Sequence, residues 1–322
     1  MKKSIFLSFI LCLCLIACMP QQAMAQKQSR MEKLLRYLND KDADKWQKNR
    51  EKLDDETKAY YAEDLSLMDV LNDLWNGQSE QAATLYFGCY EKAAQSNFPG
   101  ICEGEKIPLS QIRDKADQSI INLLEASKDK IPFSRALLDS IHATEYPVDS
   151  AMLQRLQNIR EVALLEGMLK APTPIIYQTY VKEYPNGKFI AQVNASENVR
   201  LYQLVKAAPT PANFKAFFED PEMQKYYQDR GPRPYLAEVR TLYDDFLFQR
   251  IDSLKKVGNA TAIRQIIDDY KNTPYLSTGA RTHLNDLEYL SEKADFELLK
   301  PAIVNSESLG LLQEFLKTHK YK

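Results

Sequence analysis

One spacing of mostly apolar residues, i, i+3, i+4 and i+7, occurs four times in the second half of this 322-residue chain. Residues at these positions share one face of an α-helix. The four sets are Tyr177, Tyr180, Val181, Tyr184; Phe214, Phe217, Phe218, Pro221; Ile263, Ile266, Ile267, Tyr270; and Leu312, Phe315, Leu316, His319. Their first residues lie 37, 49 and 49 positions apart. A recurrence of this length fits a unit of two helices, so the pattern predicts a helical-repeat array.

A longer helical pattern precedes each set and supplies the first helix of each pair. The predicted longer helices cover residues 150–169, 190–207, 234–256 and 282–299. The connections within the pairs combine residues that end a helix with residues that cap the next one. They are Ala171-Pro172-Thr173-Pro174, Ala208-Pro209-Thr210-Pro211, Gly258-Asn259-Ala260-Thr261 and Val304-Asn305-Ser306.

The turn after the first short helix reads Tyr184-Pro185-Asn186-Gly187, and residues 269–275 and 318–321 carry degenerate copies of it. This turn resembles that of tetratricopeptide-like repeats in exported proteins of the bacterial cell envelope. The resemblance covers residues 150–322 and implies an α-solenoid of stacked antiparallel helix pairs, a fold that usually binds partners. The last copy ends at Lys322 with no further helix to cover it. We therefore expect another part of the chain or a partner to cap it, unless relatives are longer.

The first half of the chain is also expected to be helical but less regular. Only 10 glycines occur in the sequence, and the alternation typical of strands is scarce, so we expect an all-α protein. Residues 64–94 predict a helix pair, with Ala82, Leu85, Tyr86 and Cys89 repeating the apolar spacing. Residues 98–108 contain two prolines and two glycines and predict an irregular connection. The predicted organisation is a signal peptide at 1–25, an irregular helical region at 26–147 and a repeat array at 148–322.

The amino terminus has the pattern of an export signal. Lys2 and Lys3 precede an apolar run from Ile5 to Ala17, which is too short to span a bilayer as a mature helix. Ala23-Met24-Ala25 then forms an A-x-A site before Gln26. Cleavage after Ala25 is the first expectation, with the mature chain periplasmic or secreted.

A second processing outcome stays open, because Leu15-Ile16-Ala17-Cys18 resembles the lipobox of bacterial lipoproteins. In that case Cys18 would become the lipidated first residue of an outer-membrane lipoprotein. Both outcomes take the chain out of the cytoplasm.

The charge balance excludes one class of partner. The formal net charge is −2, and it becomes −4 once the two signal lysines leave. A chain without a basic patch offers no surface for the phosphates of nucleic acid. The expected mature chain also lacks an apolar stretch long enough for a transmembrane segment, so membrane association is expected only through a lipid on Cys18.

Two cysteines, Cys89 and Cys102, remain in the expected mature chain. In an oxidising compartment they can pair, and the break predicted at residues 96–100 would let the chain turn back. A Cys89–Cys102 disulfide is therefore the first expectation, and two separate buried thiols are the alternative.

The chain shows no motif for catalysis or for binding a cofactor. His142, His283 and His319 stand alone, so no metal site is expected. Phosphate-loop, dinucleotide-binding and nucleophile-elbow patterns are absent. Paired carboxylates such as Asp244-Asp245 are expected on solvated helix faces. We therefore expect no enzyme activity, no cofactor and no catalytic residue.

Residues 219–234 form the one candidate partner-binding segment. It contains the residue types that dominate interface hot spots, namely Met223, Tyr226, Tyr227, Arg230 and Arg233. An ordinary loop between repeats, with its tyrosines packed inward, is the alternative.

Two functional hypotheses follow from these features. The first is an exported protein-interaction or scaffold module that binds an envelope protein or peptide. The second is a nutrient or glycan capture protein, motivated by the 18 tyrosines that could stack on sugars.

Overall fold

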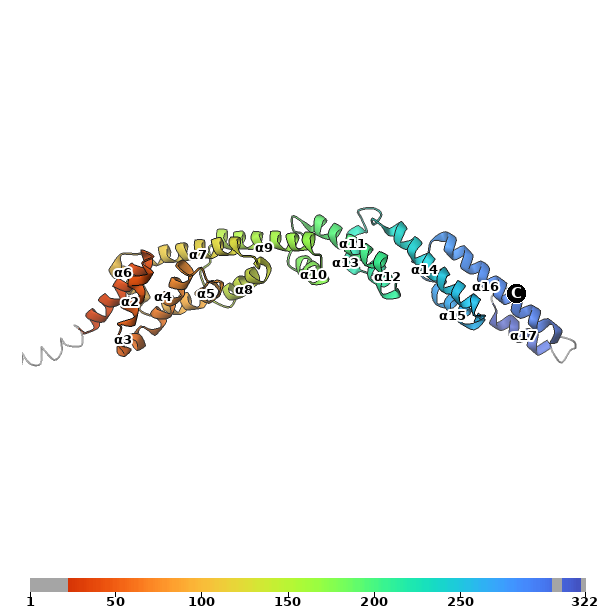
Figure 1. Cartoon of the computed structure of the whole chain (residues 1–322), viewed down its shortest axis with the longest axis horizontal. Coiled ribbons are helices and arrows are strands. Elements are labelled where there is room, and N and C mark those ends of the chain that lie inside the picture. Colours follow the sequence, from red (N-terminus) through yellow and green to blue (C-terminus); the bar gives the residue numbers. More distant parts are fainter. Residues whose placement is uncertain (1–22, 303–308, 320–322) are drawn as a thin grey trace, which may run out of the picture. The chain divides into compact units, whose positions relative to one another are not determined.

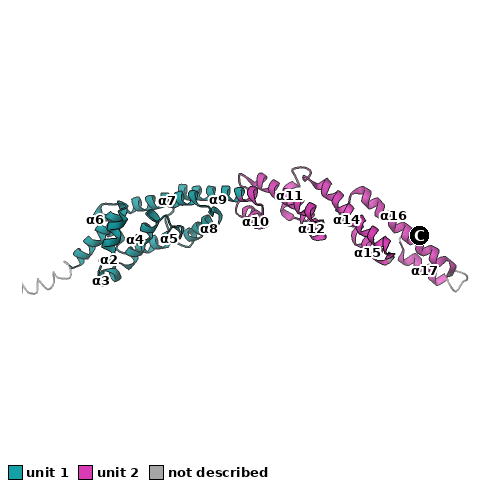
Figure 2. Ribbon diagram, in the orientation of Figure 1, with its two compact units in different colours: residues 1–166 teal, residues 167–322 magenta. Residues whose placement is uncertain are grey.

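Residues 23–302 and 309–319 are described by a computed structural model, and every regular element within them is a helix (Figure 1). This confirms the all-α prediction for that part of the chain. The chain divides into two units between Glu166 and Gly167, within helix α9 (Ser150–Lys170) (Figure 2). The division falls later than the predicted boundary at residue 147, because Tyr146, Met152 and Leu156 belong to the core of the first unit.

Unit 1 begins with a helix at residues 23–39, which contains the predicted cleavage site after Ala25. The helices that follow are α2 (Ala43–Glu51), α3 (Asp55–Tyr60), α4 (Ala62–Trp75), α5 (Glu80–Ala94), α6 (Phe98–Glu105), α7 (Leu109–Ala126), α8 (Lys130–His142) and most of α9. Helices α4 and α5 pack against each other, as the helix pair at residues 64–94 predicts, and α5 also contacts α7 and α8. Ser79 caps α5, since its Oγ accepts a hydrogen bond of 3.1 Å from Ala82 N.

The core of unit 1 runs from the first helix through α9. Leu35 and Leu38 come from the first helix, Leu71 from α4, and Tyr86 and Phe87 from α5, and all five are fully buried. Each such side chain contributes about 1.5–3 kcal/mol to stability through the apolar surface it removes from water.

Two details of unit 1 differ from the sequence predictions. Residues 98–105 form helix α6 rather than an irregular connection, because Phe98, Ile101 and Cys102 share a buried face and Pro99 stands in the first turn, where it is tolerated. Leu85, assigned to the buried stripe of α5, is 51% exposed. Ala82 and Tyr86 of the predicted set are buried, and Ala83, Phe87, Tyr90 and Ala93 widen the buried stripe of α5.

Unit 2 alternates long and short helices. They are α10 (Pro174–Glu183), α11 (Ile190–Ala207), α12 (Pro211–Phe218), α13 (Pro221–Tyr227), α14 (Leu236–Lys256), α15 (Ala260–Tyr270), α16 (Thr278–Leu299), the 3-10 turn η1 (Lys300–Ala302) and α17 (Leu309–Thr318). Neighbours in sequence pack together: α11 on α10 and α12, α15 on α14 and α16, and α17 on α16. Each predicted long and short helix is therefore present as a helix.

The predicted helix caps of unit 2 are formed. Thr173 and Thr210 cap α10 and α12 through their side-chain oxygens, each accepting a backbone N–H at 3.3 Å. Asn259 caps α15 in the same way at 3.0 Å. Gly187 N donates to Tyr184 O at 3.0 Å, which closes the predicted turn. The corresponding connection Val304-Asn305-Ser306 lies outside the described residues.

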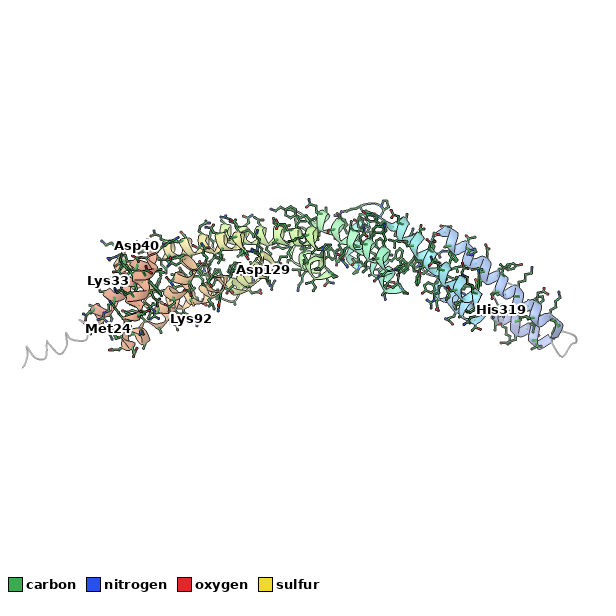
Figure 3. The ribbon with its side chains drawn as sticks, viewed as in Figure 1. Met24, Lys33, Asp40, Lys92, Asp129 and His319 are labelled. Carbon is green, nitrogen blue, oxygen red and sulfur yellow. The ribbon has the colours of Figure 1, made fainter. Side chains whose placement is uncertain are left out.

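The apolar sets of the short helices lie mainly inside. Phe214, Phe217 and Phe218 are buried in α12, and Phe315 is buried in α17. His319 follows α17 directly (Figure 3). Its ring stacks on Phe315 with 3.9 Å between ring centroids.

One member of these sets has a different role. Pro221 does not continue α12, which ends at Phe218, but begins the short helix α13. Its ring fits the first turn of a helix, where no N–H is needed. Residues 219–234, for which an ordinary loop is the alternative expectation, are thus partly helical.

In the part of the chain that the structure describes, no helix is both long enough and apolar enough to cross a membrane.

Candidate functional site

The candidate site of unit 2 is a surface hollow of about 630 Å³ that surrounds α13. Asp220 starts α13 as its N-cap, with its side chain accepting a hydrogen bond of 2.8 Å from Met223 N. The end of α12 and the start of α14 supply the other walls. The hollow is lined by Phe218, Pro221, Met223, Gln224, Lys225, Tyr227, Gln228, Gly231, Pro232, Arg233 and Leu236.

The five residues predicted to bind a partner divide into two groups. Met223, Tyr227 and Arg233 line the hollow. Tyr226 and Arg230 do not, and they contact each other instead: the Arg230 guanidinium lies 4.4 Å from the centre of the Tyr226 ring, and its Nη1 donates to Tyr226 O at 2.9 Å. Met223 is fully buried, so it forms the floor of the hollow rather than an exposed contact.

Arg233 is the most unusual side chain of the hollow, because only 9% of it is exposed. Its Nε donates to Asn198 Oδ1 at 2.6 Å, and its Nη1 donates to the carbonyl of Phe217. The guanidinium also lies 3.9 Å from the centre of the Phe217 ring. Nη2 is buried and has no hydrogen-bond partner.

The charge of Arg233 is not compensated by a direct partner. Its two acceptors are an amide and a carbonyl, and it forms no ion pair with any residue that the structure describes. Burial lowers the pKa of Arg233, an effect that the charge of Asp220 opposes. A guanidinium nonetheless keeps its proton in proteins, so the hollow contains a buried positive charge.

The backbone around Arg233 is held in place from several sides. Asn198 Nδ2 donates to Pro234 O at 3.2 Å, and Gly231 adopts a φ of +100°, which favours glycine. Tyr235 also has a left-handed backbone, with φ of +64°, and its ring stacks on Tyr202 at 4.3 Å. Such a conformation persists where surrounding contacts enforce it. These contacts fix the position of the Arg233 guanidinium.

The sequence did not indicate Asn198 as part of the site, and it indicated Phe217 only as an apolar position of a short helix. Asn198 is 1% exposed within α11 and joins this helix to the loop before α14 through its hydrogen bonds with Arg233 and Pro234. A signal for it was present, since Asn198 lies on the same helical face as the buried Val193, Leu201 and Val205. A polar residue in an apolar stripe has to find a hydrogen-bond partner.

Unit 1 contains a second hollow, of about 620 Å³ and mainly polar lining. It is lined by Arg113, Asp114, Asp117, Gln118, Ile121, Pro147, Val148, Asp149, Ser150, Ala151, Met152 and Arg155. Asp117 is its one buried carboxyl group, and it accepts a hydrogen bond of 2.5 Å from the Tyr146 hydroxyl. Burial raises the pKa of Asp117 to about 6, against the opposing effects of the Tyr146 hydrogen bond and the charge of Arg113.

The predicted Cys89–Cys102 disulfide is not formed in the structure, where both cysteines are free. Cys89 Sγ lies 3.4 Å from Ser66 Oγ of the neighbouring helix α4. Cys102 lies on the buried face of α6, and burial raises the pKa of its thiol to about 12. The helix at residues 98–105 thus places Cys102 in the core, which corresponds to the alternative of two separate thiols.

The lipidation candidate Cys18 lies outside the described residues.

No protein-family model matches the chain, and no curated protein or solved structure is significantly similar to it.

Proposed function

We propose that the chain is an exported, non-catalytic protein-interaction or scaffold module of the cell envelope, built from tetratricopeptide-like helix pairs stacked as an α-solenoid. The observation that carries this proposal is the hollow around α13, in which apolar side chains surround a buried, uncompensated guanidinium.

The helix order of unit 2 supports the proposed architecture. A long helix and a short helix alternate from α11 to α17, interrupted by α13, and each short helix packs on the long one before it. Repeats of this kind present extended surfaces to partners, since each unit contacts mainly its neighbours.

The lining of the hollow supports partner binding. Tyr227 is half-buried, and Lys225 and Gln228 are exposed at its edge. An apolar centre with a polar rim is the usual composition of a protein interface, and Tyr and Arg are enriched among residues that dominate binding.

The alternative of glycan capture rested on the high number of tyrosines. Several of these are part of the packing rather than the surface, namely Tyr86, Tyr146, Tyr177, Tyr180 and Tyr243, each at most 5% exposed. A buried ring offers no face to a sugar. The structure thus adds no observation that favours the glycan hypothesis over the interaction module.

Site-specific photocrosslinking in the cells that make the protein tests the proposal. A photoreactive residue replacing Gln228, at the edge of the hollow, is expected to give a discrete protein adduct. The same residue replacing Gln249, which is exposed on α14 and does not line the hollow, is the matched control. An absence of adducts at both positions, or the same adducts at both, would contradict partner binding at the hollow.

The proposed export has a separate test. Amino-terminal sequencing of the mature protein is expected to begin at Gln26. Incorporation of a labelled fatty acid, abolished by Cys18→Ser, would instead establish the lipoprotein alternative.

A further inference from the structure

We propose that the hollow around α13 binds an extended peptide segment that carries an Asp or Glu side chain next to an apolar residue, with this carboxylate facing Arg233. The inference rests on the proposed function, because it names the chemistry of the partner at the same site.

Arg233 carries a buried positive charge without a direct counter-charge. A buried charge is costly unless an opposite charge or a full set of hydrogen bonds compensates it. Arg233 has two neutral acceptors, and its Nη2 has none. Asp220 has the largest acidic effect on the pKa of Arg233 and Glu197 a smaller one. Asp220 accepts a hydrogen bond from Met223 N, Glu197 is paired with Arg200, and neither forms an ion pair with Arg233. A carboxylate from a partner would supply the missing counter-charge.

A partner's carboxylate can be attracted to the charge of Arg233 without contacting Nη2. Solvent does not reach Nη2, but Arg233 itself lines the hollow. A carboxylate in the hollow lies close to the guanidinium in a partly desolvated site, where electrostatic attraction is stronger than in water.

Tyr227 supplies a second donor in the same hollow. Burial and Tyr226 raise the pKa of Tyr227, whereas the charge of Arg233 lowers it, so the two side chains are within electrostatic reach of each other. A protonated phenol beside a guanidinium can donate a hydrogen bond to the same carboxylate.

The rest of the lining indicates a peptide as the occupant. Phe218 and Leu236 line the same hollow as Arg233 and offer apolar contact. Gln228 is exposed at the edge, and its amide can both donate to and accept from a peptide backbone. A peptide with an acidic residue beside an apolar one would place its carboxylate near Arg233 and its apolar side chain against Phe218 and Leu236.

Two matched pools of displayed peptides test the inference on the mature protein. Both pools have random flanks and no free terminal carboxylate, and they differ only in a central Leu-Glu-Leu or Leu-Gln-Leu. The wild-type protein is expected to retain the Glu pool roughly tenfold better than the Gln pool, a factor typical of one charge-assisted contact. Tyr227→Phe is expected to reduce this preference about threefold.

Three variants separate a binding role of Arg233 from a structural one. Arg233→Gln is expected to abolish the preference for Glu. Asn198→Asp keeps the arginine but puts a carboxylate against its Nε, with loss of the hydrogen bond from Asn198 Nδ2 to Pro234 O, and it is also expected to abolish the preference. Arg230→Gln makes the same charge change as Arg233→Gln on the exposed residue of the same loop, and the preference should survive.

The outcomes distinguish the two proposals. Equal retention of both pools, or a preference for Glu that persists in folded Asn198→Asp, would overturn the inference while leaving peptide binding intact. Retention of neither pool would overturn peptide binding at this hollow as well. Displacement of the Glu pool by octanoate at lower concentration than by the pool itself would assign the hollow to a small amphiphile and overturn the peptide as occupant.

Discussion

The Tyr146 hydroxyl donates a hydrogen bond of 2.5 Å to Asp117 Oδ1, although 29 positions separate the two residues in sequence. Both side chains are buried, and the rings of Tyr86, Phe87 and Tyr90 pack edge-on against the Tyr146 ring. Unit 1 therefore contains an acidic group inside an aromatic cluster, with one strong donor to hold it.

Asp117 is expected to make unit 1 less stable as the pH rises from 4 to 7. The pKa of Asp117 is about 6 in the folded chain, against 3.8 for an unperturbed Asp, so the folded state binds the proton more tightly. The resulting stabilisation is fully present below the unfolded value and is lost as the pH rises through 6. A shift of this size corresponds to about 3 kcal/mol.

Asp117→Asn removes this titration while keeping an acceptor for Tyr146. The free energy of unfolding of Asp117→Asn, minus that of the wild type, is expected to rise by about 2.5 kcal/mol between pH 4 and pH 7, because the unfolded Asp is already partly ionised at pH 4. Urea denaturation of both proteins at several pH values measures it. Parallel profiles for the two proteins would show that Asp117 does not titrate in this range.

The two cysteines are expected to react as separate thiols. The chain that begins at Gln26 should be alkylated at both Cys89 and Cys102 when it is unfolded without reductant, because both are free in the structure. In the folded protein Cys102 should stay unlabelled, since it is buried and its pKa is raised to about 12. Peptide mass spectrometry after iodoacetamide treatment reads both results. Labelling that appears only after reduction would restore the disulfide.

Phe214 is expected to be essential to the packing of unit 2. It is 1% exposed, and the centroid of its ring lies 4.9 Å from that of Tyr243 and 5.5 Å from that of Phe246, both in α14. Phe214→Ala should lower the free energy of unfolding by about 3–5 kcal/mol. Ile175→Ala is the matched control, because Ile175 lies in the first turn of another short helix but is 76% exposed, and its effect should stay within about 0.5 kcal/mol. Similar effects of the two substitutions would contradict the assigned packing of α12.

Thr210 is expected to contribute as the cap of α12. Its Oγ1 accepts a hydrogen bond of 3.3 Å from Asn213 N. Thr210→Ala should cost about 1 kcal/mol, and Thr210→Ser, which keeps the hydroxyl, should recover most of it. Thermal or urea denaturation compares the three proteins. An equal loss in the serine variant would point to packing of the threonine methyl group instead of the cap.

Features that depend on near neighbours in the sequence were predictable. Helix positions, the caps at Ser79, Thr173, Thr210 and Asn259, and the turn at Tyr184 all arise from contacts within a few residues. Local pattern was less reliable where two interpretations fit the same residues. In α5, Ala82 and Tyr86 lie beside Ala83 and Phe87, so the buried stripe is wide and the spacing alone wrongly included Leu85.

The candidate site was predictable only in part. The residue types of Met223, Tyr227 and Arg233 identified the segment, but the sequence did not show that Tyr226 and Arg230 pair outside the hollow. Nor did it show that Arg233 is buried, since an arginine near two prolines and a glycine is usually exposed.

Helical class and the order of long and short helices could thus be read from the chain, because side chains three and four positions apart fall on one helix face whatever surrounds them. The contacts of Arg233 with Asn198, 35 positions away, and of Tyr146 with Asp117 required the packed fold. Such contacts form when separate helices bury their apolar faces together, and the cost of burying a charge then depends on which polar groups that packing happens to bring within reach.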